Sequence, residues 1–214
     1  MLKIQKFVCN MIQENCYVVS DETGEGIIVD CGAYYEEEIQ AIINYVQQNN
    51  IKLKHIVATH GHFDHNFGNY AIYEAFGLKT EVPAKDQELL ANLPLQVQTI
   101  LGTTYQKQMP PVGRYLQEDD IISFGNHTFT LIATPGHTPG SSFLYCKEES
   151  VAFSGDTLFK GSIGRTDLEG GSMFQIIQSL RMICQLPDNT RILPGHGPET
   201  TIGNELSSNP YLDR

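Results

Sequence analysis

Short apolar runs separated by turn-forming residues dominate the beginning of the chain and predict strands. One strand is expected to end at Val8, and others are expected to cover Cys16–Val19 and Gly26–Asp30. The segment 21–26 between the last two has the composition of a turn. These two strands are therefore expected to form a hairpin.

Helices are expected where apolar residues recur at spacings of three and four. The apolar residues from Ile39 to Val46 share one face of a helix predicted over 35–48, and its acidic start suits the positive end of the helix dipole. A second helix is expected after a short buried strand at Lys54–Ala58, with Gly77 at its C-terminal cap.

The second half of the chain continues with strands and helices. Strands are expected at Lys79–Val82, Ile121–Phe124, Thr128–Ile132, Ser142–Cys146, Val151–Ser154 and Arg191–Leu193. A helix that begins at a Ser172–Gln175 capping box is expected to bury Met173 among other apolar residues. Residues 84–116 are irregular, so a short helix near 86–93 and a flap over a functional site are expected there. The tail 198–214 is polar and loosely patterned. With no repeat and no linker, one domain over 1–214 is predicted.

Four ligand-type residues lie between the strand at Lys54–Ala58 and the helix that follows it. His60, His62, Asp64 and His65 form the pattern H-x-H-x-D-H. His60 and His62 can point the same way from extended backbone, while Asp64 and His65 can face a second point nearby. One ion would use only part of this set, so the spacing indicates two adjacent metal sites. The alternative, a polar loop with scattered histidines, does not explain this density of ligands.

Three further ligand-type residues each follow an apolar strand and a small residue. They are His137 after Gly136, Asp156 after Gly155 and His196 after Gly195. Strand ends converge on one edge of stacked sheets, and glycine allows close backbone approach there. We therefore expect these side chains to join the H-x-H-x-D-H group. His55 and His127 lack this context and are expected to be ordinary structural or surface residues.

Composition and charge narrow the class of protein. The 214 residues suffice for one domain with a sizeable core. A formal net charge of −11 without any basic run disfavours nucleic acid as the main partner. No apolar run approaches the roughly 20 residues that span a bilayer, and the N-terminus lacks a signal-peptide core. We expect a cytoplasmic protein, monomeric or homodimeric, that binds neither nucleic acid nor membrane.

The cysteines are odd in number and contain no close pair. They are Cys9, Cys16, Cys31, Cys146 and Cys184. This pattern predicts buried free thiols in a reducing compartment. Cys31, which follows Asp30 at a strand end, could lie near a cleft.

The order H-x-H-x-D-H, then His137, Asp156 and His196, resembles that of the metallo-β-lactamase superfamily. Within it, Gly155–Phe159 and Leu193–Gly197 are similar to the glyoxalase II branch. The resemblance covers nearly the whole chain and implies an α/β fold, a four-layer αβ/βα sandwich with a binuclear site at one edge. It also implies the ligand sets: His60, His62 and His137 for one metal, Asp64, His65 and His196 for the second, and Asp156 as the bridge.

These ligands suit two divalent ions, zinc foremost, with iron or manganese also tolerated. Two neighbouring ions can share a hydroxide, because metal binding lowers the pKa of water from about 15.7 to about 7. That hydroxide would attack a carbonyl with His60, His62 and Asp64 at the catalytic centre. No protein nucleophile is needed.

Arg165 and Asp167 occupy positions where glyoxalase II enzymes carry a lysine and a tyrosine. Gly164–Asp167 looks more like the persulfide dioxygenases, a mononuclear iron branch, whereas Gly161–Leu168 also resembles short bacterial glyoxalase II-like hydrolases. Arg165 and Asp167 are expected to bind substrate, because a guanidinium can hold a carboxylate or carbonyl oxygen bidentately. The alternative is a surface arginine paired with Asp167.

The resemblance leaves several activities open. The favoured one is hydrolysis of thioesters of the hydroxyacylglutathione type, such as S-lactoylglutathione. The alternatives are a mononuclear iron persulfide dioxygenase, a lactone or phosphodiester hydrolase, and a non-catalytic metal-binding domain. The complete ligand set disfavours the last of these, and the acidic surface disfavours a nuclease.

Full-length glyoxalase II enzymes add a C-terminal helical domain whose basic residues grip the glutathione moiety. After His196 the sequence is short, and Arg214 is its sole basic residue. Remote binding of the thiol carrier is then expected to contribute little to transition-state stabilisation. Broad thioester use with a weak glutathione preference is the expected result.

Overall fold

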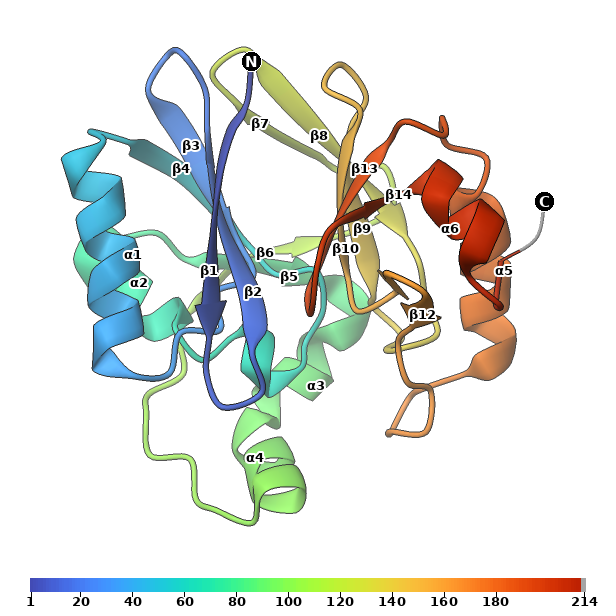
Figure 1. The fold of residues 1–214 in the computed structure, drawn as a ribbon. Coiled ribbons are helices and arrows are strands. Elements are labelled where there is room, and N and C mark those ends of the chain that lie inside the picture. Colours follow the sequence, from blue (N-terminus) through green and yellow to red (C-terminus); the bar gives the residue numbers. More distant parts are fainter. Residues whose placement is uncertain (213–214) are drawn as a thin grey trace.

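Two six-stranded β-sheets face each other in the computed structural model, which describes residues 1–212 (Figure 1). The first sheet has the order β1-β2-β3-β4-β5-β6 and consists of β1 (Lys3–Cys9), β2 (Glu14–Ser20), β3 (Glu25–Val29), β4 (Lys52–Val57), β5 (Thr80–Pro83) and β6 (Val112–Leu116). The second has the order β14-β13-β10-β9-β8-β7 and consists of β7 (Ile121–Phe124), β8 (His127–Ala133), β9 (Ser142–Cys146), β10 (Val151–Gly155), β13 (Arg191–Pro194) and β14 (Thr200–Thr201). A small separate hairpin joins β11 (Leu158–Phe159) to β12 (Ser162–Ile163).

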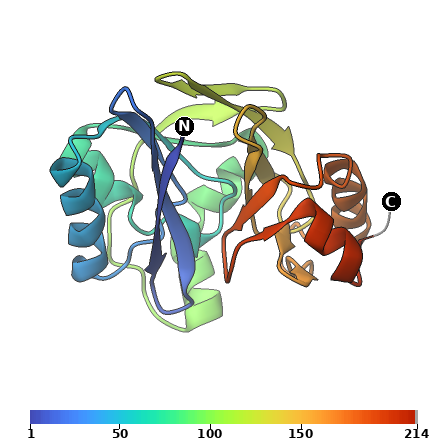
Figure 2. The same cartoon turned by 45° about the horizontal axis from the view of Figure 1, so that its top comes forward.

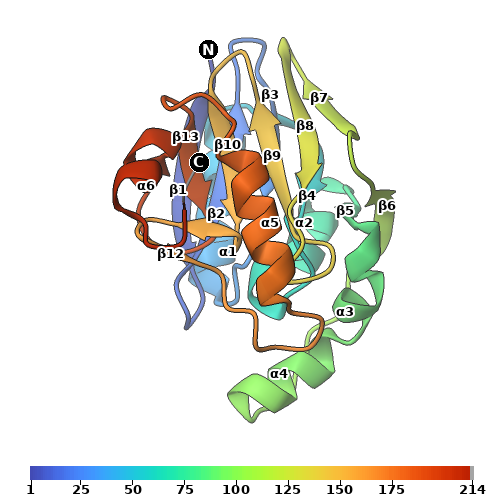
Figure 3. The ribbon, with the colours of Figure 1, turned by 90° about the vertical axis from the view of Figure 1, so that its right-hand side faces the viewer.

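Helices cover the outer face of each sheet. The first sheet is covered by α1 (Glu36–Gln48) and α2 (Asn69–Phe76), and the second by α5 (Met173–Ile183) and α6 (Ile202–Ser208) (Figures 1 and 2). Figure 3 shows α5 lying over the outer face of the second sheet. The order helix, sheet, sheet, helix confirms the predicted α/β fold, the four-layer αβ/βα sandwich.

The main core lies between the sheets, and β2 shows how the sequence builds it. Tyr17 and Val19 face the second sheet, whereas Cys16 and Val18 face the layer of α1 and α2. Because both faces of the sheet are covered, every residue of β2 is buried. The expected hairpins at β2–β3 and β7–β8 are confirmed as antiparallel pairs. One domain over 1–214 stays a prediction.

Residues 84–116 are more regular than expected. The predicted short helix is present as α3 (Gln87–Ala91), but α4 (Leu93–Leu101) and strand β6 were not predicted. Pro94 lies in the first turn of α4, where a missing N–H donor costs no helical hydrogen bond. Leu93 and Val97 of α4 pack with Phe63 and Phe67. The segment is therefore anchored to the chain that carries the H-x-H-x-D-H motif.

The tail also forms regular structure, β14 and α6, that its polar composition did not indicate. Glu205 is buried and accepts hydrogen bonds from Gly161 N (2.7 Å), Thr200 Oγ1 (2.5 Å) and Asn209 Nδ2 (2.8 Å). Its carboxylate thus docks α6 onto the β11–β12 hairpin. Arg214 lies outside the described residues.

The start of α5 confirms one expectation and corrects another. Ser172 caps the helix by accepting a hydrogen bond from Gln175 N (3.3 Å). Met173, however, is 52% exposed, because the buried face of the helix begins one turn later at Ile176. The prediction that Met173 is buried was wrong.

All five cysteines are buried, as expected. Cys31 packs closely against the backbone of Gly68, so its thiol does not open onto a cleft. Within residues 1–212 no helix is long and apolar enough to cross a membrane. The cytoplasmic location and the monomeric or homodimeric state stay predictions.

Candidate metal centre

The structure gathers all seven sequence-predicted ligand residues at one edge of the two sheets. They are His60, His62, Asp64 and His65 after β4, His137 after β8, Asp156 after β10 and His196 after β13. Most of these side chains are buried, and His196 is the most open, with 26% of its side chain exposed. The rule of a strand followed by a small residue and a ligand-type residue therefore identified side chains that converge in the structure.

Three histidines form the first group. One ring nitrogen of each of His60, His62 and His137 lies within 4.8 Å of the others. His62 Nδ1 and His137 Nε2 are only 2.8 Å apart. Burial lowers the pKa of His60 well below its ordinary value and that of His62 to about 4. Both rings are therefore neutral at pH 7, which is the form that binds metal.

The second group consists of Asp64, His65 and His196, whose ligand atoms also lie within 4.8 Å of one another. Asp64 Oδ2 is 3.1 Å from His196 Nε2 and 3.4 Å from His65 Nε2. Burial alone would lower the pKa of His65, but the carboxylates of Asp64, Asp156 and Asp30 raise it well above its ordinary value. This end of the site therefore carries the stronger negative potential.

Asp156 lies between the two groups. Its Oδ1 is 3.4 Å from His65 Nε2, and its Oδ2 is 3.6 Å from both His137 Nε2 and His196 Nε2. Asp156 therefore offers carboxylate oxygens to both groups. Gly195 makes the arrangement possible, because a Cβ there would stand 2.4 Å from Asp156 Oδ1.

Unsatisfied polar atoms show that the site fits metal ions. His60 Nε2, His65 Nε2 and Asp156 Oδ1 are buried and have no hydrogen-bond partner among the residues that the structure describes. Leaving such atoms unpaired is costly in a folded protein. Their convergence, and the imidazole and carboxylate chemistry of the set, fit divalent cations.

Several of the ligand side chains contact supporting groups that the sequence analysis did not identify. Asp30 Oδ2 is 3.0 Å from His65 Nδ1, and Asp30 also accepts hydrogen bonds from Thr59 N (2.6 Å) and Thr59 Oγ1 (2.8 Å). The backbone carbonyl of Arg165 lies 2.8 Å from His137 Nδ1. Such contacts orient the rings of metal-binding histidines. The signal for Asp30 was present, since it too follows a strand end.

Asp86 and Gln96 tie the segment 84–101 to the ligand loops. Asp86 is buried and accepts hydrogen bonds from Gly61 N (2.8 Å), Thr138 Oγ1 (2.6 Å) and Gly140 N (2.6 Å). Gln96 of α4 donates to the Gly61 carbonyl at 3.1 Å. One carboxylate thus joins the loop of His60 and His62 to the loop of His137. The segment that was expected to form a flap therefore supports the ligand loops, and its action as a flap stays a prediction.

Arg165 and Asp167 lie on the loop after β12 and pair with each other. Arg165 Nε and Nη2 each donate to Asp167 at 2.7 Å, and the two side chains are 58% and 67% exposed. This geometry is the surface pair considered as the alternative, and their binding of substrate stays a prediction. His55 contacts Glu81 and the Ser123 carbonyl, so it lies outside the ligand groups.

His127 also lies apart from the site. It bridges Asp21 and Glu149 at 2.9 Å each. Burial alone would lower its pKa, but Asp21 and Glu149 raise it. Its contacts are those of a structural residue.

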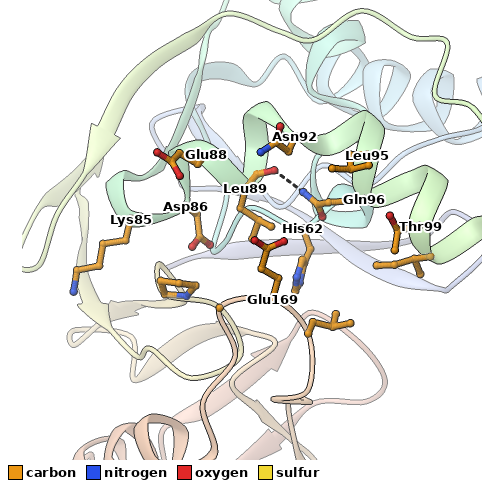
Figure 4. Close-up of a pocket in the computed structure, with 14 residues that line it drawn as sticks. His62, Lys85, Asp86, Glu88, Leu89, Asn92, Leu95, Gln96, Thr99 and Glu169 are labelled. Carbon is orange, nitrogen blue, oxygen red and sulfur yellow. Dashed lines mark hydrogen bonds between the residues drawn. The ribbon is translucent and has the colours of Figure 1, made fainter.

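A cavity of about 320 Å³ opens beside His62 (Figure 4). It lies between α3 and α4 on one side and the loops of Pro139 and Leu168–Gly170 on the other. A volume in this range suits a small organic ligand. The cavity therefore provides space for a substrate next to the first group of histidines.

The fold and the clustered imidazole and carboxylate groups define a metal-dependent hydrolase. Residues 10–196 match the Metallo-beta-lactamase superfamily, and the chain belongs to that superfamily, as the sequence predicted.

Three relatives cover almost the whole chain. The hydroxyacylglutathione hydrolase GloC of Haemophilus influenzae is 34% identical over 214 residues, which are 99% of this chain and 99% of GloC. The crystal structure of the BLEG-1 B3 metallo-beta-lactamase has a TM-score of 0.89 at 34% identity and covers 99% of both chains. The structure of TTHA1623 in a di-iron-bound form has a TM-score of 0.86 at 34% identity and covers 97% of this chain and 100% of that one.

Proposed function

We propose that this protein hydrolyses acyl thioesters of the hydroxyacylglutathione type with two divalent ions, zinc foremost, held by the seven residues of the centre. The main observation in support of this proposal is the position of Asp156, whose carboxylate lies within 3.6 Å of nitrogen atoms in both ligand groups. The similarity to GloC supports the thioester substrate, and the di-iron form of TTHA1623 supports a pair of ions.

Each part of the site has a role in this reaction. When bound, the ions supply Lewis acidity and lower the pKa of coordinated water to about 7, so that a nucleophile is available at neutral pH. Neutral His60 and His62 offer lone pairs on the side of the cavity, while Asp30 and the Arg165 carbonyl keep His65 and His137 oriented. The cavity offers space for the thioester beside His62.

The persulfide dioxygenase alternative requires a single iron ion per chain. The number of bound ions therefore distinguishes this alternative from a binuclear hydrolase better than the identity of the metal does. Two complete groups of ligands favour a binuclear hydrolase over a mononuclear oxygenase. Lactone and phosphodiester hydrolysis would use the same ligands. Only activity assays can distinguish these two reactions from thioester hydrolysis.

The purified protein is expected to contain two metal ions per chain and to release free thiol from S-lactoylglutathione. Elemental analysis gives the metal-to-chain ratio, and a thiol-reactive dye follows the reaction. A chelator should abolish turnover, and added zinc should restore it. One iron per chain with oxygen uptake on a persulfide would overturn the proposal, and so would faster turnover of a lactone, a phosphodiester or a β-lactam than of any thioester.

Arg165→Ala is expected to lower kcat/KM for thioesters by about tenfold, because a bound carbonyl or carboxylate loses a charged hydrogen-bond donor. Metal content should not change, since His137 contacts the backbone carbonyl of residue 165 and not its side chain. Arg191→Ala is the matched control, because Arg191 forms a similar exposed pair with Glu199 at 2.7 Å. Equal rates in both variants would show that Arg165 only pairs with Asp167 at the surface and does not bind substrate.

A further inference from the structure

The cavity beside His62 has an apolar wall that nothing in the described chain covers. Leu89, Leu95 and Ile100 of α3 and α4 line one side, opposite Pro139 and Leu168. Leu95 is 59% exposed and Ile100 is 43% exposed, which is high for side chains that line a concave surface. These residues suit an aliphatic group.

The charges around the same cavity are mainly negative. Lys85, Glu88 and Glu169 line it, and among residues 1–212 none of the three has an ion-pair or hydrogen-bond partner for its charged group. Figure 4 shows the Glu169 side chain reaching across the cavity towards α3, whereas the Lys85 side chain is directed outward. The buried carboxylate of Asp86 also lines the cavity. A group bound in the cavity therefore meets the carboxylates of Glu88 and Glu169, which are not paired with any cation among the described residues.

The volume of the cavity indicates which part of a thioester it holds. A lactoyl group has few atoms, whereas a volume of about 320 Å³ is in the range for a whole small ligand. The acyl carbonyl has to reach the metal centre beyond His62. The thiol carrier is then the part that extends into the cavity.

We propose, resting on the thioesterase activity proposed above, that this cavity selects an uncharged, partly aliphatic thiol carrier and disfavours glutathione. The carrier class is that of pantetheine or N-acetylcysteamine, whose amide and methylene groups match the polar side chains of Asn92 and Thr99 and the apolar wall. Glutathione brings two carboxylates and one ammonium, so its net negative charge opposes Glu88 and Glu169. The two glutamates are the specificity determinants.

The test compares one acyl group on two carriers. For the metal-loaded protein, kcat/KM is measured with S-lactoyl-N-acetylcysteamine and with S-lactoylglutathione. We expect the neutral carrier to be preferred by about tenfold, as for partly screened like charges at a solvent-exposed site. Glu169→Lys and Glu88→Lys should each raise the ratio of kcat/KM for S-lactoylglutathione to kcat/KM for the neutral thioester about three- to tenfold.

Control variants separate local charge from net charge. Glu148→Lys makes the same change in net charge in the turn before β10, at the end of that strand opposite Asp156, and should leave the carrier ratio unchanged. Glu169→Gln, a nearly isosteric change at an exposed side chain, should move the ratio in the same direction as Glu169→Lys by a smaller amount. A preference for glutathione in the unaltered protein, or a carrier ratio that neither lysine variant changes, would overturn the inference. Failure to cleave either thioester would instead contradict the proposed function.

Discussion

Asp156→Ala is expected to lower kcat/KM for thioester hydrolysis at least about a hundredfold and to reduce the number of metal ions bound per chain. Even residues that only support metal ligands commonly cost 10–100-fold when removed. Asp156 reaches nitrogen atoms of both ligand groups within 3.6 Å, so its loss weakens two sites together. Thiol release and elemental analysis on the same preparation measure both effects.

His55→Ala is the control for that variant. His55 contacts Glu81 and the Ser123 carbonyl, outside the ligand groups, so its removal should leave rate and metal content nearly intact. Full metal content and full rate in Asp156→Ala would show that the assignment of the seven ligands is wrong.

Asp86→Ala should impair the protein in a different way, by releasing two ligand loops from each other. The variant leaves three donors, Gly61 N, Thr138 Oγ1 and Gly140 N, without their buried acceptor. Hydrogen bonds to a charged group contribute about 1.5–3 kcal/mol each. The free energy of unfolding should fall by at least about 3 kcal/mol, and metal affinity should fall by about tenfold or more.

Denaturant unfolding and a metal titration test these two effects. Asp86→Asn retains one oxygen acceptor but replaces the other with a donor that faces Gly140 N, so it should lie between the alanine variant and the unaltered protein. Gln87→Ala changes the neighbouring exposed residue and serves as control. A stable Asp86→Ala protein with unchanged metal affinity would contradict the scaffold role of this carboxylate.

The sequence predicted the parts of the site that depend on local order along the chain. His137, Asp156 and His196 could be found because each follows a strand and a glycine, and strand ends meet at a sheet edge. Asp86 could not be found in this way, since its partners Thr138 and Gly140 lie 52 and 54 residues away. Its neighbourhood shows no pattern that distinguishes it from a solvent-exposed aspartate.

The same limit applies to the fold. The alternation of apolar runs predicted most strands and the helices α1, α2 and α5, because their buried faces repeat at regular spacing. The polar composition around Glu205 concealed α6, whose docking depends on a hydrogen bond from Gly161, 44 residues away. The helix expected near 86–93 stops just before Pro94, whereas in the structure Pro94 lies in the first turn of α4.

The contact between His137 and the backbone of residue 165 allows the side chain at this position to change during evolution. The histidine is oriented by a peptide carbonyl, which every amino acid provides, so the side chain at position 165 is free to change without a penalty in metal binding. New substrate contacts can arise there by single substitutions that leave the reactive centre intact. Position 165 is therefore a suitable place to start a saturation library aimed at altered substrates, with metal content retained across the library.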